Sequence, residues 1–267
     1  MTPQMSDEKL IAQYFDKLRQ SGLLKDTSEP RAMAIAAYID APKQADRNLL
    51  WAFDSEFYLS RHPDVMQSGE NPLVHFIQKG WREGRSPHPL IDMRYLSDHH
   101  PQLAIKEDTP LAAFLATSAE KAVSSHPLFD ADYYASQQPI PSEGSSLRHF
   151  LSGKGGSARP HRLFIPAYYR SQIPSLARET SPLLHYLSEG WKAGLKPHPD
   201  FDTAYYLSAH PDVADAGVEP LTHYVEYGQL EDRNPSFTFH SATYRRLVGF
   251  GKTPRMSPLE HKLIYNR

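Results

Sequence analysis

The chain has 267 residues, of which 40% are hydrophobic and 22% are charged, a composition typical of a folded protein. Its net charge of −2 offers no basic surface to a polyanion, so we expect no nucleic-acid partner. The absence of cysteine excludes a disulfide framework and thiolate metal sites. No stretch approaches the 18 consecutive apolar residues of a membrane span, and the first residues lack the pattern of a secretory signal. A cytoplasmic protein is therefore expected.

Residues 1–50 differ in sequence from the rest of the chain. Apolar residues at helical spacing from Leu10 to Leu18, and again from Ala32 to Ile39, predict two helices. A stack of repeats needs a cover for its exposed end. We therefore interpret residues 1–50 as an N-terminal helical cap.

Residues 51–267 contain one sequence pattern six times. Residues 53–87 read FDSEFYLSRHPDVMQSGENPLVHFIQKGWREGRSP, and residues 201–235 read FDTAYYLSAHPDVADAGVEPLTHYVEYGQLEDRNP. Copies one to six begin near residues 53, 91, 129, 164, 201 and 239. A fixed period of this length indicates a repeat architecture, and no segment alternates like a strand. The sequence predicts an all-α fold, in which short helix pairs stack as a solenoid-like array.

The first helix of each copy is predicted to follow a buried apolar residue. In five copies this residue is a phenylalanine: Phe53, Phe129, Phe164, Phe201 and Phe239. The aspartate after it is placed to cap the free N–H groups of a helix, at about 1 kcal/mol each. The caps are Asp54, Asp92, Asp130 and Asp202. An aromatic pair follows, such as Tyr205–Tyr206, and its first member is expected to share a face with the phenylalanine. A proline such as Pro211 then ends the helix.

In most copies the second helix begins with a capping residue followed by proline, as in Asn71–Pro72, Ser181–Pro182 and Ser257–Pro258. An apolar stripe at helical spacing follows. A glycine just past the stripe is predicted to adopt a left-handed conformation: Gly80, Gly190 and Gly228.

Fourteen histidines suggest a metal site, but their spacing favours packing. Stacked helices lie about 8–10 Å apart, whereas a zinc–nitrogen bond is about 2 Å, so we do not expect equivalent histidines of neighbouring copies to share an ion. We interpret the second-helix histidines as partly buried residues that hydrogen-bond to the next turn or repeat: His75, His149, His185, His223 and His261. The histidines next to prolines are interpreted as surface turn residues: His62, His88, His100, His126, His161, His198 and His210.

The turns GWREGR and GWKAGL combine an aromatic residue with cations. A tryptophan flanked by cations is suited to contact an acidic glycan or a protein partner. The candidate contact residues are Trp81, Arg82, Arg85, Trp191, Lys192 and Lys196. The alternative is that each tryptophan folds over the junction between repeats.

No motif in the chain indicates catalysis. Residues 153–157, GKGGS, lack the preceding strand and the spacing of a phosphate loop. Serine-nucleophile and HExxH motifs are absent as well. We therefore expect no cofactor, no metal and no enzymatic activity.

The repeat consensus FDxxYYLxxHPDVxxAGxxPLxHYxxxGWxEGRxPHP resembles tandem repeats that accompany bacterial glycosyltransferases and surface-polysaccharide biosynthesis proteins. The resemblance implies an association with glycan assembly and implies no catalytic residues. It favours a non-catalytic scaffold that binds a protein partner in glycan synthesis. Carbohydrate binding through Trp81, Trp191 and exposed tyrosines is the alternative, and a stand-alone enzyme of glycan metabolism has the least support.

Overall fold

A computed structural model describes residues 51–103, 123–140, 145–253 and 256–265, with residues 9, 11–13 and 114 in addition. Apart from residues 9 and 11–13, the predicted cap of residues 1–50 lies outside this range. All regular secondary structure of the described residues is helical, which confirms the all-α prediction. The solenoid-like stacking of the copies stays a prediction. Two compact units are present, one of residues up to His126 with Pro139–Ser152, the other of Pro127–Gln138 with Gly153–Arg267.

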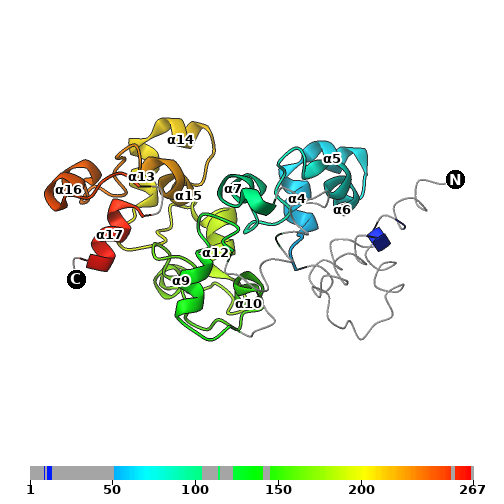
Figure 1. Cartoon of the computed structure of the whole chain (residues 1–267), viewed down its shortest axis with the longest axis horizontal. Coiled ribbons are helices and arrows are strands. Elements are labelled where there is room, and N and C mark those ends of the chain that lie inside the picture. The colour runs from blue at the N-terminus through cyan, green and yellow to red at the C-terminus, as the bar shows by residue number, and fades with distance from the viewer. Residues whose placement is uncertain are drawn as a thin grey trace. The chain divides into compact units, whose positions relative to one another are not determined.

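In the first unit, copy one folds into four consecutive segments: α4 (Ser55–Arg61), α5 (Pro63–Ser68), α6 (Pro72–His75) and the π-helical turn η1 (Phe76–Gly80). Helices α4, α5 and α6 pack against one another (Figure 1). The other helical segments of this unit are α7 (Met93–His99), the 3-10 turn η2 (Pro101–Leu103) and α10 (Ser146–Leu151).

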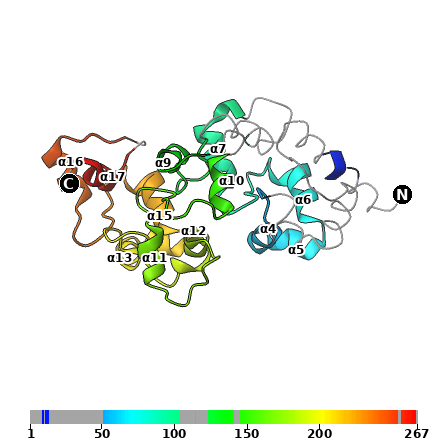
Figure 2. The same cartoon turned by 90° about the horizontal axis from the view of Figure 1, so that it is seen from below.

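The second unit holds α9 and copies four to six. Copy three contributes α9 (Ala131–Ser136). Copy four forms α11 (Pro166–Ser171), α12 (Pro182–His185) and η3 (Tyr186–Gly190). Copy five forms α13 (Thr203–Ala209), α14 (Pro211–Asp215), α15 (Pro220–His223) and η4 (Tyr224–Gly228). Copy six forms α16 (Ser241–Val248) and α17 (Pro258–Tyr265), which Figure 2 shows together in orange and red.

Copies one and five therefore contain three short α-helices and a π-helical turn, not a helix pair. The predicted terminators Pro63 and Pro211 occupy the first position of an additional helix, α5 or α14. Proline is suited to that position because its fixed φ is helical. It lacks an N–H, but the N–H at the first position of a helix makes no hydrogen bond within the helix. The prolines thus end one helix and begin the next.

The predicted aspartate caps the first helix. The Oδ1 atom of Asp54 accepts a hydrogen bond from the backbone N–H of Phe57 at 2.9 Å. The Oδ1 atom of Asp202 accepts one from the N–H of Tyr205 at 3.0 Å. The equivalent aspartates cap α7 and α9 in the same way: Asp92 and Asp130. The capping prediction is confirmed in these copies.

The opening phenylalanine packs on the second member of the aromatic pair. The ring centroids of Phe53 and Tyr58 lie 5.4 Å apart and both side chains are buried, whereas Phe57 is half-buried. The predicted contact with the first member is wrong because Phe53 precedes the N-cap and lies outside the helix. A residue before the cap packs on the fourth helical residue, here Tyr58. Later copies repeat the contact at 5.3–5.5 Å: Phe129–Tyr134, Phe164–Tyr169, Phe201–Tyr206 and Phe239–Tyr244.

Capping of the second helix varies between copies. The Asn71 side chain accepts hydrogen bonds from the N–H groups of Leu73 and Val74, as predicted. Ser181 makes no such bond, so the prediction is wrong for this copy. In copy five the side chain of Glu219 caps α15.

The glycine that ends the π-helical turn is required for close packing. A Cβ atom at Gly228 would overlap the hydroxyl of Tyr206, and Gly80 and Gly190 face equivalent tyrosines. None of the three has a positive φ, so the predicted left-handed conformation is wrong. The left-handed residues lie four positions later: Gly84, Gly194 and Asp232.

A backbone hydrogen bond joins the two ends of each of the first five copies. The N–H of Asp54 donates to the carbonyl of Pro87 at 2.8 Å, and the N–H of Asp202 donates to the carbonyl of Pro235 at 2.9 Å. Equivalent bonds of 2.8–3.0 Å form in the intervening copies: Asp92–Ser125, Asp130–Pro160 and Ile165–Pro197. Each bond holds the start of a copy against the last residues of the same copy.

Candidate functional site

The two predicted contact tryptophans lie against their own turns. The Nε1–H of Trp81 donates to the carbonyl of Ile77 at 3.1 Å, and that of Trp191 donates to the carbonyl of Leu187 at 3.2 Å. Trp81 is half-buried, and Trp191 is only 9% exposed. The expectation of an exposed indole is therefore wrong for Trp191, because its polar atom is already paired and its ring is covered.

Arg85 closes the turn of its own copy. Its Nη1 and Nη2 atoms lie 3.0 and 2.8 Å from the two carboxylate oxygens of Asp64, and its Nε atom lies 2.6 Å from Glu83. The hydrogen bonds from Arg85 lower the pKa of Asp64 to about 2. Asp212 and Arg233 repeat this bidentate pair in copy five. Arg85 therefore does not present a free cation to a partner, contrary to the prediction.

Copy four closes the same turn with a glutamine. The Gln172 amide donates to the Lys196 carbonyl at 2.7 Å and accepts from the Lys196 N–H at 3.0 Å. The ammonium of Lys196 lies 2.6 Å from the carboxylate of Asp202, and this bond raises the pKa of Lys196. Lys196 thus connects copy four to Asp202, the residue that caps the first helix of copy five. The prediction that Lys196 contacts a partner is therefore wrong.

Arg82 and Lys192 are the predicted contact residues that remain exposed. The guanidinium carbon of Arg82 lies 4.5 Å from the Trp81 ring centroid, and its Nη1 donates to the Gln78 carbonyl at 2.6 Å. The ammonium of Lys192 lies 5.7 Å from the Trp191 ring. Of the predicted contact set, the structure leaves these two cations on the surface.

The second-helix histidines hydrogen-bond to a tyrosine of their own copy. His223 Nδ1 lies 2.9 Å from the hydroxyl of Tyr206, and burial lowers the pKa of this histidine. The same pair forms in three other copies at 2.7–2.8 Å: Tyr58–His75, Tyr169–His185 and Tyr244–His261. His149 lies on α10. A packing role agrees with this geometry, but the predicted partner in the next turn or repeat is wrong.

The histidines between copies are buried, contrary to the prediction of surface turns. Four of them are 5–7% exposed: His88, His126, His161 and His198. The Nδ1 atom of His88 accepts the N–H of Leu90 at 3.0 Å and thereby closes the turn between two copies. The histidines that follow the first helix are half-buried: His62, His100 and His210.

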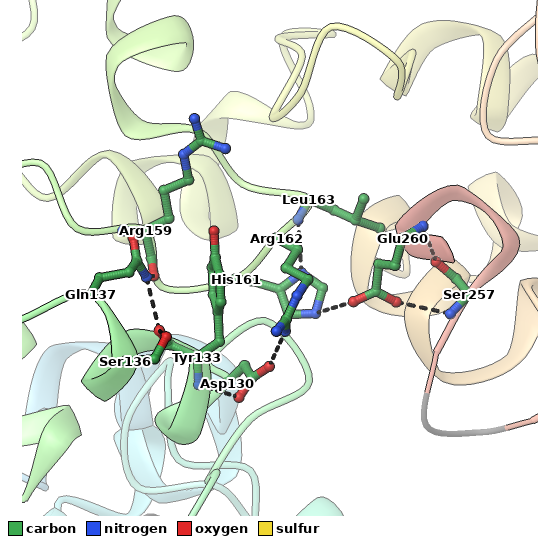
Figure 3. A network of polar contacts seen from close by, with 10 residues as sticks. All are labelled: Asp130, Tyr133, Ser136, Gln137, Arg159, His161, Arg162, Leu163, Ser257 and Glu260. Atoms are coloured by element: carbon green, nitrogen blue, oxygen red, sulfur yellow. Dashed lines mark hydrogen bonds and ion pairs between the residues drawn. The ribbon is translucent and has the colours of Figure 1, made fainter. Parts of the chain in front are cut away.

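A polar cluster of the second unit surrounds His161 (Figure 3). The Nε2 atom of His161 lies 3.5 Å from Glu260 Oε1, and its Nδ1 atom accepts the N–H of Leu163 at 3.1 Å. The Oε2 atom of Glu260 accepts the N–H of Ser257 at 2.9 Å, and the hydroxyl of Ser257 accepts the N–H of Glu260 at 3.1 Å. This reciprocal pair is a capping box at the start of α17.

The rest of this cluster holds the turn after copy three. Arg162 lies 2.8 Å from the carboxylate of Asp130 and 4.2 Å from the ring centroid of Tyr133. The Gln137 amide bonds to both the N–H and the carbonyl of Arg159, as the equivalent glutamine does in copy four. These contacts fix the backbone on either side of His161.

The serine, histidine and glutamate of this cluster are not arranged for nucleophilic catalysis. Activation of a serine requires the imidazole to bond to the hydroxyl, with the acid behind the imidazole. Figure 3 shows Glu260 between His161 and Ser257, whose hydroxyl accepts a backbone N–H. Among the described residues, no group of three or more histidines or acids could hold a metal ion. The cluster therefore has a structural role.

Exposed large apolar side chains concentrate in copies five and six. Phe237, Leu247, Tyr265 and Tyr227 are 77%, 76%, 64% and 56% exposed. Two valines of the same copies are also exposed: Val218 and Val248. Elsewhere in the described part of the chain, Met66 is the one comparable side chain. A protein surface normally has single, scattered apolar side chains. Several exposed apolar side chains within 48 positions are more than this normal number.

The exposed residues of copies five and six lie next to other aromatic rings. Phe237 makes an edge-to-face contact with Tyr205 at 6.3 Å, and Tyr265 lies 4.6 Å from the ring of His261. No sequence motif marks these residues as a site. A comparison of the copies could have indicated two of them. At the position before the turn glycine, copies one and four have a charged residue, Lys79 or Glu189, whereas copies five and six have Tyr227 and Tyr265.

No protein family, curated protein or solved structure matches the chain. Within the described residues, no helix is both long enough and apolar enough to cross a membrane.

Proposed function

We propose that the chain is a non-catalytic helical-repeat module that binds a protein partner through copies five and six. The observation that carries this proposal is the concentration of exposed Phe237, Leu247, Tyr265 and Tyr227 in these copies. Aromatic and large aliphatic side chains are the residues that contribute most when an interface is buried. The turns of copies one and four, in contrast, use Arg85 and Lys196 for contacts within the array.

The repeat consensus supports a placement of this module in bacterial surface-polysaccharide synthesis. In that setting the chain acts as a scaffold that holds a component of glycan assembly.

Carbohydrate binding is the second candidate function. It is favoured by the exposed guanidinium of Arg82 beside the half-buried ring of Trp81, a combination suited to an acidic sugar. Tryptophan fluorescence during titration with acidic oligosaccharides tests it. Saturable quenching that the Trp81→Phe and Arg82→Gln variants abolish supports this function, and unchanged fluorescence contradicts it.

The protein-partner proposal is tested by affinity capture from the source cells with quantitative mass spectrometry. The baits are the full chain, the triple variant Phe237→Ser, Leu247→Ser, Tyr265→Ser, and the control Met66→Ser, which alters an exposed apolar residue of copy one. We expect a protein that the wild type and the control retain and the triple variant loses. Circular dichroism verifies that the three baits are equally folded. The same set of proteins on all three baits contradicts the proposal.

A further inference from the structure

At three junctions between copies, a histidine holds a tight turn with both its backbone and its side chain. At the first junction, the N–H of Ile91 donates to the carbonyl of His88 at 3.0 Å, and the N–H of Leu90 donates to the Nδ1 atom of His88 at 3.0 Å. At the junction of copies four and five, the N–H groups of Phe201 and Asp200 make the same two bonds to His198, each at 3.1 Å.

These hydrogen bonds require a neutral imidazole. An Nδ1 atom that accepts an N–H keeps its lone pair, so the ring proton is on Nε2. A second proton would convert Nδ1 into a donor that faces another donor and would place a charge at a buried position. The turn and the charged imidazole are therefore incompatible.

The groups around the two histidines do not compensate for such a charge. His88 faces the Asp54 carboxylate, which is occupied as a helix cap, and the imidazole of His126. Burial lowers the pKa of His88 to about 4.

The environment of His198 contains charges of both signs. It faces the carboxylate of Asp200 and the cations Arg159 and Lys262, and Asp200 also pairs with Lys262 at 3.3 Å. Burial is again the main cause that lowers the pKa of His198 to about 4. The turn is thus formed when the imidazole is neutral.

Two other junctions provide contrasts within the same chain. His161 also accepts a backbone N–H on its Nδ1 atom, from Leu163, but its Nε2 atom lies 3.5 Å from the carboxylate of Glu260, so this ring faces a buried acid. At the junction of copies five and six the slot is Ser236, whose carbonyl accepts the N–H of Phe239 at 3.3 Å without a titratable side chain. The turn itself therefore does not depend on histidine.

We propose that the junctions at His88 and His198 form an acid-sensitive conformational device, in which protonation of the imidazole opens the turn between adjacent copies. The Ser236 junction stays closed over the same range of pH. This regulation goes beyond the proposed binding function, since it alters how copies one and two, and copies four and five, are held together.

The sign of the effect follows from the lowered pKa. An unfolded histidine has a pKa of about 6.5, so the stabilisation is complete above that pH and is lost as the pH falls toward about 4. Between pH 7.5 and pH 5, opening that exposes the imidazole becomes about 30-fold more favourable per histidine.

Amide hydrogen exchange of the full chain, followed by NMR and corrected for the intrinsic rate, tests the proposal. We expect the protection of the Leu90 and Asp200 amides to fall at least tenfold between pH 7.5 and pH 5, and that of Phe239 to stay constant. The variants His88→Asn and His198→Asn supply an oxygen acceptor that does not titrate, so their protection is expected to be independent of pH. His99→Asn alters an exposed histidine and serves as the control.

Equal loss of protection in the wild type and in the asparagine variants would overturn the proposal. If the variants do not fold, the NMR titration of the His88 and His198 ring protons in the wild type decides. A pKa at or above 6.5 for both rings overturns the proposal, and values near 4 to 5 support it. Partner capture at pH 7.5 is independent of this result.

Discussion

The hydroxyl of Tyr206 occupies the space that a side chain at Gly228 would need. Tyr206 lies on the first helix of copy five, and Gly228 ends the π-helical turn 22 positions later. The turn therefore approaches the helix so closely that only glycine fits at this position. The same pair recurs in three other copies: Tyr58–Gly80, Tyr134–Gly155 and Tyr169–Gly190.

The Gly228→Ala variant is expected to lose stability because its new methyl group overlaps the Tyr206 hydroxyl. Overpacking of a well-packed site costs about 1–3 kcal/mol, and urea unfolding measures it. Gly251→Ala is the control, because no atom lies within 4 Å of a Cβ at that position and its φ is not positive. Equal stability of the two variants would contradict the packing.

The Tyr206→Phe variant is expected to lose about 1 kcal/mol, because the Nδ1 atom of His223 loses its buried partner. In addition, the cost of Gly228→Ala should shrink in this background, since the obstructing hydroxyl is gone. A double-mutant cycle measures this coupling. Tyr265→Phe, at an exposed tyrosine, is the control. A coupling near zero between Tyr206→Phe and Gly228→Ala is the contrary result.

The Asp54→Ala variant is expected to destabilise α4 by about 1 kcal/mol, because the N–H of Phe57 loses its acceptor. Asp54→Asn keeps an oxygen at this position and should restore most of the stability. Thermal unfolding distinguishes the two. A loss of equal size in both variants would mean that the carboxylate charge, and not the cap, matters.

The Arg233→Gln variant is expected to raise the pKa of Asp212 from about 2 toward 3.8, since the hydrogen bond from Arg233 is the main cause of its lowered value. The pair thus contributes stability above about pH 4 that is lost as the pH falls through about 2. NMR titration of the carboxylates measures the change. Asp64, which pairs with Arg85 in the other unit, should stay near 2. An unaltered Asp212 contradicts the assignment.

The features of the fold that depend on local chemistry were predictable from the sequence. The helical class and the capping by Asp54 and Asp202 follow from residues within a few positions of one another. The repeat period follows from the similarity of the copies to one another. The contact between Phe201 and Tyr206 was not predictable in this way. Phe201 precedes the helix cap, so helical spacing does not give its partner.

Several of the wrong predictions concern contacts between distant positions. Gly228 resembles a helix terminator in the sequence, and only the approach of Tyr206 shows why it is a glycine. His88 and His198 stand beside prolines, as surface turn residues often do, yet the turn folds their rings inward. Arg85 resembles a free cation because its partner, Asp64, lies 21 positions away. Such pairings depend on how the end of a copy packs against its beginning, and local sequence patterns do not show this packing.

Site-specific photo-crosslinking in the source cell tests the proposed function most directly. A photoreactive phenylalanine analogue replaces Phe237 in copy five, Trp81 in the turn of copy one, or Met66 as the exposed control. We predict a discrete protein adduct from position 237 and none from positions 81 and 66. Adducts from position 81 alone, or none from position 237, would contradict the assignment of the partner surface to copies five and six.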